Sequence, residues 1–258
     1  MSADRPLHLA IVGWGRMGRV LAAAAEARGH RVALRIDPEA PGADARSVEH
    51  ADLSGIDVAL EFTRAEAAPR NVHRLLEAGR PVVSGTTGWN DELEAARTLA
   101  RERGVGFLWA PNYSLGVQAL FRVVDRAASL FGAIGGFAPY LVEEHHQLKR
   151  DAPSGTALRL AQSLVERTPG KTRWDVAPTG APVPPEVVSV AWVRAGEIPG
   201  THRLGWDGPG ETVEIVHRAR DRAVFAHGAV RAAEWLVAQP GPRTLDEMID
   251  ELLGDASH

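Results

Sequence analysis

Short apolar runs alternate with amphipathic stretches over the first part of the chain. The runs lie at 7–13, 30–37, 56–63, 81–88 and 105–114. The stretches between them, at 20–29, 67–79 and 91–104, have apolar residues at helical spacing and end in glycine. Strands that alternate with helices are typical of a parallel sheet covered on both faces. We therefore predict an α/β fold with a doubly wound parallel sheet.

The pattern changes after about residue 114. Helices are expected at 116–132 and 156–167, a strand at 139–147, and a Pro/Gly-rich mobile loop at 168–186. Further β segments are expected at 187–196, 202–207, 211–219 and 223–228, followed by helices at 228–239 and 244–253. This order predicts an inserted α+β domain with an open, mainly antiparallel sheet. The expected domains are residues 1–113 with 222–258, and residues 114–221.

Composition narrows the function classes. A net charge of −4 over 258 residues gives no overall basic field for nucleic acid. Cysteine is absent, which excludes disulfides, thiolate nucleophiles and Cys-based metal sites. The N-terminus does not resemble a signal peptide and no segment has the length of a membrane span, so we expect a cytoplasmic protein.

A G-x-G-x-x-G turn follows the first predicted strand directly and opens a helix. Gly13 is expected to allow the tight turn, Gly15 to let a pyrophosphate approach the backbone, and Gly18 to let helix and strand pack closely. Asp37, at the end of the second strand, is the expected acid for an adenosine ribose. The arrangement predicts a dinucleotide site in a Rossmann-type domain.

The charged residues near this turn bear on the choice of coenzyme. The carboxylate of Asp37 favours NADH, because it repels the 2′-phosphate of NADPH. Arg16, inside the turn, and Arg35 are candidate phosphate ligands, although solvated surface arginines are equally consistent with the pattern.

Two further turns follow predicted strands, at the edge where open α/β sheets bind ligands. Their small residues and backbone donors suit a nicotinamide carboxamide, and ordinary turn chemistry is the alternative. The candidate residues are Gly85, Thr86, Thr87, Ala110, Pro111 and Asn112.

The densest polar cluster of the chain is 143–156, EEHHQLKRDAPSGT, between a strand and a helix. Ser154, Gly155 and Thr156 at the helix start predict a site for an anion, and we expect this anion to be a carboxylate. His145 and His146 are adjacent on a strand and point to opposite faces, so we expect no metal site. A charged loop that caps the helix is the structural alternative.

Lys149 is unusual in this sequence. Only it and Lys171 are lysines among 29 basic residues, which leaves 29 − 2 = 27 arginines. An ammonium group can release a proton in a low-dielectric site, whereas a guanidinium cannot. We therefore expect proton chemistry at Lys149.

The segment EEHHQLKRDAPSGTAL closely resembles the signature E-x-H-H-x-x-K-x-D-x-P-S-G-T-A of 4-hydroxy-tetrahydrodipicolinate reductases. The resemblance covers nearly the whole chain. Further matching pieces occur in the family's order: GRMG at 15–18, FT at 62–63, GTTG at 85–88, APNYS at 110–114, RAGEIPGTH at 194–202 and FAHGAVRAAEWL at 225–236.

The resemblance implies reduction of a cyclic, doubly carboxylated substrate to tetrahydrodipicolinate with NADH or NADPH, in lysine and diaminopimelate biosynthesis. It implies that His145 is the proton donor, with Lys149 as its partner, and that the protein is a homotetramer built through the sheet of the inserted domain. Other implied roles are substrate-carboxylate binding by His146, Gly155 and Thr156, and cofactor binding by Met17 in the glycine turn, by Phe62 and Thr63, and by Gly85 and Thr87.

Two departures from familiar family members favour NADH over NADPH: the turn is short and contains Trp14, and Pro38 rather than Arg follows Asp37. Two other functions stay open from the sequence. An amino-acid dehydrogenase would oxidise an amino acid with NAD, and a non-catalytic dinucleotide sensor would not depend on His145 or Lys149.

Overall fold

The computed structural model describes residues 5–176 and 181–254, which form two compact units. The first unit comprises residues 1–115 and 222–258, and the second comprises residues 116–221. In the described part of the chain, no helix is both long and apolar enough to cross a membrane.

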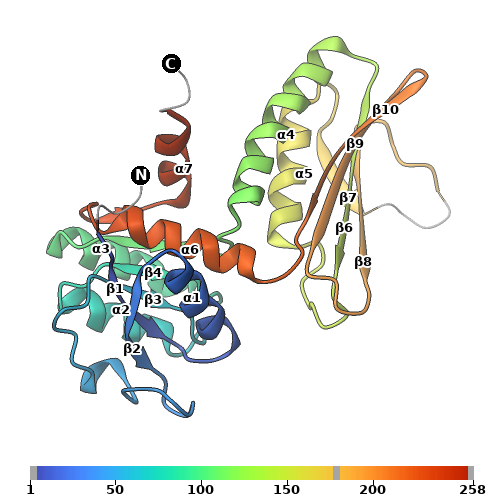
Figure 1. Ribbon diagram of the computed structural model, residues 1–258. Coiled ribbons are helices and arrows are strands. Elements are labelled where there is room, and N and C mark those ends of the chain that lie inside the picture. Colours follow the sequence, from blue (N-terminus) through green and yellow to red (C-terminus); the bar gives the residue numbers. More distant parts are fainter. Residues whose placement is uncertain (1–4, 177–180, 255–258) are drawn as a thin grey trace. The chain divides into compact units, whose positions relative to one another are not determined.

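The first unit is built on a parallel sheet of six strands in the order β11-β5-β4-β3-β1-β2 (Figure 1). Its strands are β1 (His8–Val12), β2 (Arg31–Ile36), β3 (Val58–Glu61), β4 (Val82–Ser84), β5 (Phe107–Trp109) and β11 (Pro242–Arg243). Its helices are α1 (Arg16–Ala27), α2 (Ala68–Glu77), α3 (Leu93–Arg103), α6 (Ala223–Leu236) and α7 (Leu245–Gly254), with short 3₁₀ turns η1 (Val48–His50) and η2 (Asn90–Glu92).

Alternation along β1 explains why this sheet is covered on both faces. Leu9 and Ile11 pack in one buried cluster with α1, α6 and α7, whereas Ala10 and Val12 pack in another with α2 and α3. Successive strand residues point to opposite faces, so β1, which is apolar from Leu9 to Val12, is buried on both sides there. The doubly wound fold predicted from the sequence is confirmed.

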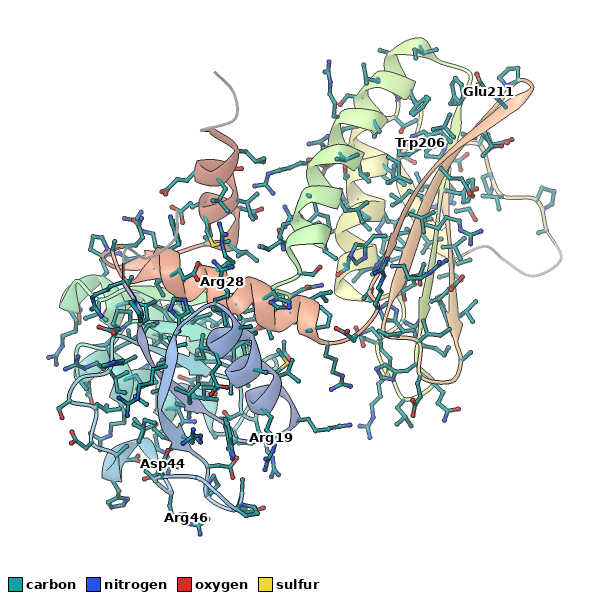
Figure 2. All side chains as sticks on the ribbon, in the orientation of Figure 1. Arg19, Arg28, Asp44, Arg46, Trp206 and Glu211 are labelled. Carbon is teal, nitrogen blue, oxygen red and sulfur yellow. The ribbon has the colours of Figure 1, made fainter. Side chains whose placement is uncertain are left out.

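The second unit has a sheet of five strands in the order β10-β9-β6-β8-β7. Its elements are α4 (Leu115–Ile134), β6 (Ala138–His145), α5 (Gly155–Arg167), β7 (Arg173–Val176), β8 (Val187–Arg194), β9 (Thr201–Gly208) and β10 (Glu211–Arg218). Helices α4 and α5 lie on the same face of this sheet (Figure 1). Trp206 is fully buried and stacks on Phe131 of α4, with 5.0 Å between ring centroids (Figure 2).

Three sequence expectations for these elements were wrong. The second sheet is mixed rather than mainly antiparallel, because β8 pairs in parallel with both β6 and β7. Residues 223–228 are helical, since Ala226 and Ala229 continue the buried stripe of α6. The expected loop at 168–186 contains strand β7; its residues 177–180 lie outside the described part.

Candidate active site

The glycine turn of the first unit has the geometry that a dinucleotide requires. Gly13 adopts φ +96°, and a Cβ there would lie 2.2 Å from the carbonyl oxygen of Phe62. A Cβ at Gly18 would lie 2.0 Å from the Gly13 carbonyl oxygen, whereas one at Gly15 would meet no described atom within 4 Å. Helix α1 begins at Arg16 without a side-chain cap. The open space at Gly15 and the uncapped N–H groups fit a pyrophosphate.

Asp37 directly follows β2 and holds the turn together. Its Oδ2 accepts the N–H of Trp14 at 2.8 Å, and its Oδ1 accepts those of Glu39 and Ala40 at 2.9 and 2.8 Å. Burial acts to raise the pKa of Asp37, but these amides and the charge of Arg64 outweigh it and lower the pKa. The group is therefore an oriented carboxylate near neutral pH.

The ring of Trp14 lies close to two guanidinium groups. The Cζ atoms of Arg19 and Arg35 are 5.5 and 5.2 Å from its ring centroid. Arg35 also donates to Asp44 at 3.3 Å. Arg35 thus has partners within the protein, while Arg16 is exposed at the turn.

A buried carboxylate connects the two loops that follow β3 and β4. The carboxylate of Glu61 accepts the hydroxyls of Ser84 at 2.7 Å, Thr86 at 3.0 Å, and Thr63. The Thr86 hydroxyl also accepts the N–H of Thr63 at 2.8 Å. Burial raises the pKa of Glu61, and the three hydroxyls oppose this. Thr86 is therefore a structural member of the predicted nicotinamide site.

The neighbouring turns are fixed by indole and phenol groups. Trp89 and Trp109 both donate their Nε1–H to the carbonyl of Thr86, at 2.8 and 2.7 Å. The hydroxyl of Tyr113 is hydrogen-bonded to the carbonyl of Ser84 at 2.8 Å. Among the other predicted residues of this edge, Gly85 packs against the ring of Phe62, and Asn112 accepts the N–H of Ser114. Thr63 is half-buried, Ala110 is buried, and Thr87 and Pro111 are exposed.

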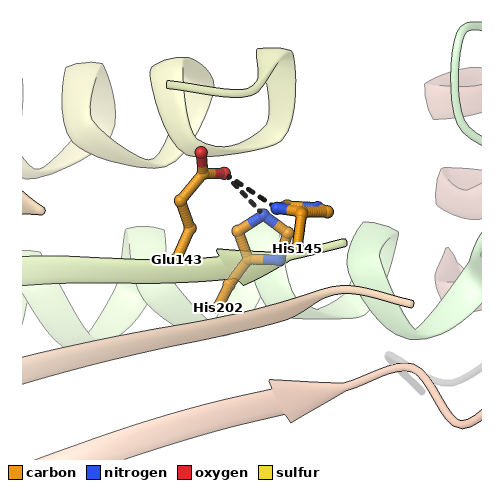
Figure 3. A group of neighbouring side chains, drawn as sticks. All are labelled: Glu143, His145 and His202. Carbon is orange, nitrogen blue, oxygen red and sulfur yellow. Dashed lines mark ion pairs between the residues drawn. The ribbon is translucent and has the colours of Figure 1, made fainter. Parts of the chain in front are cut away.

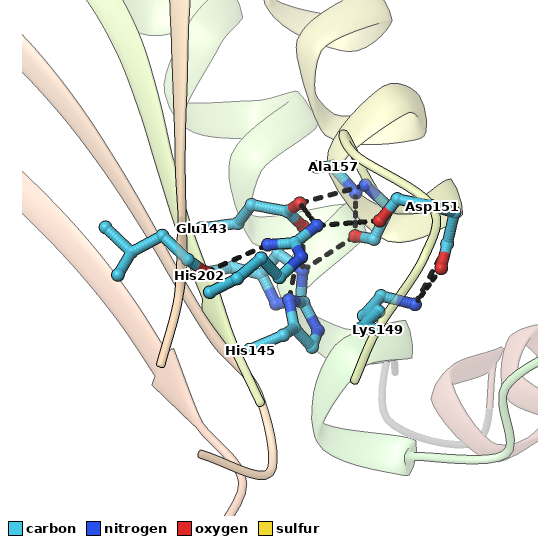
Figure 4. Close-up of polar contacts among 9 residues, drawn as sticks. Glu143, His145, Lys149, Asp151, Ala157 and His202 are labelled. Carbon is cyan, nitrogen blue, oxygen red and sulfur yellow. Dashed lines mark hydrogen bonds and ion pairs between the residues drawn. The ribbon is translucent and has the colours of Figure 1, made fainter. Parts of the chain in front are cut away.

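In the second unit, Glu143 of β6 is fully buried and connects several polar groups (Figure 4). Its Oε1 accepts the backbone N–H of Ser154 at 3.0 Å and the guanidinium of Arg194 at 2.7 Å. Its Oε2 lies 3.5 Å from Nδ1 of His145 and 3.6 Å from Nε2 of His202 (Figure 3). Because β6 and β9 are antiparallel, register places Glu143 directly opposite His202.

Burial and neighbouring charges together set the protonation states of Glu143 and His145. Burial acts to raise the pKa of Glu143, but contacts from His202, Ser154 and Arg194 hold that pKa well below its usual range. Burial lowers the pKa of His145 to about 4, although the charge of Glu143 opposes the shift. Near neutral pH the protein therefore holds an ionised Glu143 beside a neutral His145.

Helix α5 begins beside this cluster. The hydroxyl of Ser154 caps the helix by accepting the N–H of Ala157 at 3.2 Å. The backbone N–H of Ser154 donates to the carboxylate of Glu143. Ser154 is thus engaged within the protein. Gly155 is exposed, and a Cβ there would meet no described atom within 4 Å, so an anion has room at the first turn. Thr156 is half-buried in the same turn.

The loop between β6 and α5 carries the remaining predicted residues. Lys149 Nζ binds Asp151 at 2.7 and 2.9 Å, and half-buried His146 accepts the N–H of Lys149 at its carbonyl. Arg194 donates to the carbonyl of Asp151 at 2.7 Å. This loop is therefore linked to Glu143 through Arg194.

The donor set of Glu143, His145 and His202 also resembles a metal site, since their nearest ligand atoms lie within 4.8 Å of one another. However, the guanidinium of Arg194 already balances the carboxylate charge, and its proximity opposes a divalent cation. We interpret the trio as a polar cluster around the carboxylate of Glu143, and the absence of a metal stays a prediction.

Comparison with known proteins identifies the family. Residues 7–113 match the model of the N-terminal part of dihydrodipicolinate reductase, and residues 116–252 match that of its C-terminal part. The chain belongs to the dihydrodipicolinate reductase family. Its relatives named 4-hydroxy-tetrahydrodipicolinate reductase include one from Christiangramia forsetii, 31% identical over 95% of this chain and 99% of the relative. Another, from Chromobacterium violaceum, is 38% identical over 89% and 92%.

Solved structures agree in fold. The dipicolinate-bound dihydrodipicolinate reductase of Paenisporosarcina sp. TG-14 superimposes with a TM-score of 0.76 at 20% identity, over 95% of this chain and all of the other. The DAP dehydrogenase of C. glutamicum gives a TM-score of 0.52 at 16% identity, over 96% and 94%. The predicted family and the Rossmann-type fold class with a second α+β unit are confirmed.

Some residues of these sites were not singled out by sequence reasoning. His202 and Arg194 lie within a segment that matches the family, but no local pattern reveals that both approach Glu143. Glu61 ends a strand that reads simply as apolar. The signal for Glu61 was available: a charged residue at the end of a buried run, followed closely by a threonine, needs hydroxyl or amide partners.

Proposed function

We propose that this protein reduces 4-hydroxy-tetrahydrodipicolinate to tetrahydrodipicolinate with NADH or NADPH, in lysine and diaminopimelate biosynthesis. The observation that carries the proposal is the match of both family models, in order, along residues 7–113 and 116–252. The two local arrangements agree with it: a glycine turn suited to a dinucleotide, and a helix start beside a buried His–Glu pair.

In this proposal the first unit holds the coenzyme, which supplies a hydride from its nicotinamide. The turn formed by Gly13, Gly15 and Gly18 receives the pyrophosphate at Gly15, with Arg16 and Met17 in the same turn. Asp37 receives the adenosine ribose and favours NADH. The loops braced by Glu61 and the turn after β5 together hold the nicotinamide end. Their residues are Phe62, Thr63, Gly85 and Thr87, and Ala110, Pro111 and Asn112.

The second unit binds the dicarboxylate and handles the proton. Gly155 and Thr156 at the start of α5, with His146, bind a substrate carboxylate. His145 delivers the proton, and Lys149 acts as its partner. Because His145 is neutral in the free protein, it must gain a proton when the negatively charged substrate binds, since nearby negative charge favours the imidazolium.

We also propose that the protein is a cytoplasmic homotetramer assembled through the second sheet. The face of this sheet opposite α4 and α5 carries Val193 and Val216, which are 45% and 46% exposed. Apolar side chains on a sheet face without helices suit contact with another copy of the chain. Sedimentation equilibrium tests this assembly directly.

A coupled assay tests the activity. Dihydrodipicolinate synthase condenses pyruvate with aspartate semialdehyde, this protein is added, and coenzyme absorbance is followed with NADH and with NADPH. We expect coenzyme oxidation that requires both enzymes. Oxidation of an amino acid with NAD, together with no turnover of the synthase product, would instead identify an amino-acid dehydrogenase.

A further inference from the structure

We propose that Glu143 is a positioning residue that holds Nδ1–H of His145 and thereby makes Nε2 the nitrogen that takes up and delivers the proton. The inference rests on the proposed role of His145 and adds a second residue that sets how the imidazole works. A neutral imidazole carries one proton, and the group that faces one nitrogen decides which of the two nitrogens carries it.

The first observation is the position of the carboxylate. Glu143 and His145 are two residues apart on β6, so their side chains share a face of the sheet. Oε2 of Glu143 lies 3.5 Å from Nδ1 of His145, and both atoms are buried and lack a hydrogen bond in the described structure. Such contacts are often long in a free enzyme and shorten when substrate binds.

The second observation is that two hydrogen bonds restrict rotation of the Glu143 carboxylate. Its other oxygen, Oε1, accepts the N–H of Ser154 and the guanidinium of Arg194. These two donors, from the start of α5 and from the end of β8, hold the carboxylate so that Oε2 faces the histidines (Figure 4). His202 Nε2, at 3.6 Å, approaches the same oxygen from β9.

The third observation concerns the other edge of the His145 ring. A Cβ on Gly200 would lie 3.1 Å from Nε2 of His145, and Gly200 adopts φ +150°, where glycine is favoured. Glycine at this position therefore keeps the Nε2 edge clear. With Nδ1 against the carboxylate and Nε2 clear, Nε2 takes up a proton and Glu143 stabilises the resulting imidazolium.

Glu143→Gln gives a sharp test because the geometry predicts the orientation of the new amide. Ser154 and Arg194 both donate to Oε1, so the amide oxygen should stay there and the NH₂ group should replace Oε2. That NH₂ donates to Nδ1 and forces the proton of His145 onto Nε2. The wild-type tautomer should therefore be Nδ1–H, and the variant's should be Nε2–H.

The tautomer is read by long-range ¹H–¹⁵N correlation spectra of histidine-labelled protein, with His145→Asn to assign the signals. In the coupled assay, kcat of Glu143→Gln should fall by about 10²–10⁴-fold, while KM and the binding of pyridine-2,6-dicarboxylate change little. Glu211→Gln, an exposed glutamate at the far end of the same sheet, is the matched control and should match wild type in both readouts (Figure 2).

The proposal is overturned if wild-type His145 carries its proton on Nε2, or if Glu143→Gln keeps both the tautomer and kcat. A loss of dicarboxylate binding equal to the loss of kcat would also overturn it, because the role would then be structural. If Glu143→Gln does not fold, Glu143→Asp is used instead, because it withdraws the carboxylate by one methylene and should give a mixture of tautomers. An unchanged tautomer in Glu143→Asp would contradict the proposal. A wild type with the Nδ1–H tautomer but no reductase activity would refute the proposed function alone.

Discussion

A substitution at Lys149 tests whether this residue only attracts an anion or also takes part in proton transfer. Its ammonium is hydrogen-bonded to the carboxylate of Asp151, in a chain that has only one other lysine and 27 arginines. Lys149→Arg preserves the charge but replaces a group that can release a proton with one that cannot. We expect kcat to fall at least about a hundredfold, with a much smaller change in KM, measured in the coupled assay.

The other lysine provides the control. Lys171 donates to the carbonyls of Pro185 and Val187, and neither of these hydrogen bonds involves a residue of the His145 cluster. Lys171→Arg should leave kcat unchanged. Pyridine-2,6-dicarboxylate binding by the Lys149→Arg variant excludes simple displacement of substrate by the larger side chain. Near-normal kcat in Lys149→Arg would reduce Lys149 to an electrostatic anchor.

Asp37 should set the coenzyme preference. Three backbone amides orient its carboxylate and help to keep it ionised, so a 2′-phosphate meets a fixed negative charge. We expect kcat/KM to be higher with NADH, and Asp37→Asn to reduce the NADH/NADPH ratio. Asp52→Asn makes the same charge change in the loop before β3 and should not alter the ratio. A wild-type preference for NADPH of tenfold, about 1.4 kcal/mol, would contradict the argument.

Individual residues also show where sequence reasoning stops. His145, Lys149 and the three turn glycines lie in local motifs, whose spacing is visible along the chain. His202 lies 202 − 143 = 59 residues from Glu143, and only the register of β6 against β9 brings them together. A side chain that acts across a sheet has no signature in its own segment.

The start of helix α5 is the predicted binding site for a substrate carboxylate. Ser154 caps this helix, and in the proposed function Gly155 and Thr156 of its first turn bind the substrate carboxylate. Thr156→Val keeps the shape but removes the hydroxyl, so inhibition by pyridine-2,6-dicarboxylate should weaken by about 1–3 kcal/mol. Thr168→Val, at the other end of α5, makes the same change and should leave inhibition as in wild type. If both variants were inhibited as strongly as wild type, the dicarboxylate would not bind at the Thr156 hydroxyl.

The elements themselves were largely predictable, because strand and helix periodicities differ and glycines mark their ends. The errors came from tertiary context. Helix α5 crosses over from β6 to β7, and β8 lies between these two strands and parallel to both, which periodicity alone does not show. Residues 223–228 contain Val and Phe, which favour strands, but their alanines pack helically in α6.

For the chain as a whole, the first unit depends on joining two segments that are distant in sequence. Glu234 of α6 binds Arg28 at 2.6 and 2.8 Å and Nε2 of His30 at 2.7 Å. The Nδ1 atom of His30 accepts the N–H of Leu7 at 3.2 Å. A buried carboxylate thus connects the C-terminal return segment to the beginning of the sheet.

Glu234→Gln should therefore destabilise the protein. The substitution leaves Arg28 without its counter-charge, and removing one partner of a buried pair costs about 3–5 kcal/mol. Because the Arg28 side chain is 29% exposed, we expect the lower end, about 3 kcal/mol, in urea denaturation at neutral pH. Glu26→Gln, on the exposed side of α1, is the matched control and should change stability little.

The same pair should contribute to stability in a pH-dependent way. Burial acts to raise the pKa of Glu234, but hydrogen bonds from Arg28 and His30 outweigh it, so the folded-state pKa lies below the ordinary value of 4.5. The unfolded state then binds more protons between the two pKa values, and stability rises with pH there. The contribution is complete above about pH 4.5 and is lost as pH falls through the folded-state pKa. Urea titrations should thus show the deficit of Glu234→Gln shrinking below pH 4.5, whereas a deficit that is constant with pH would show that packing, not charge, causes it.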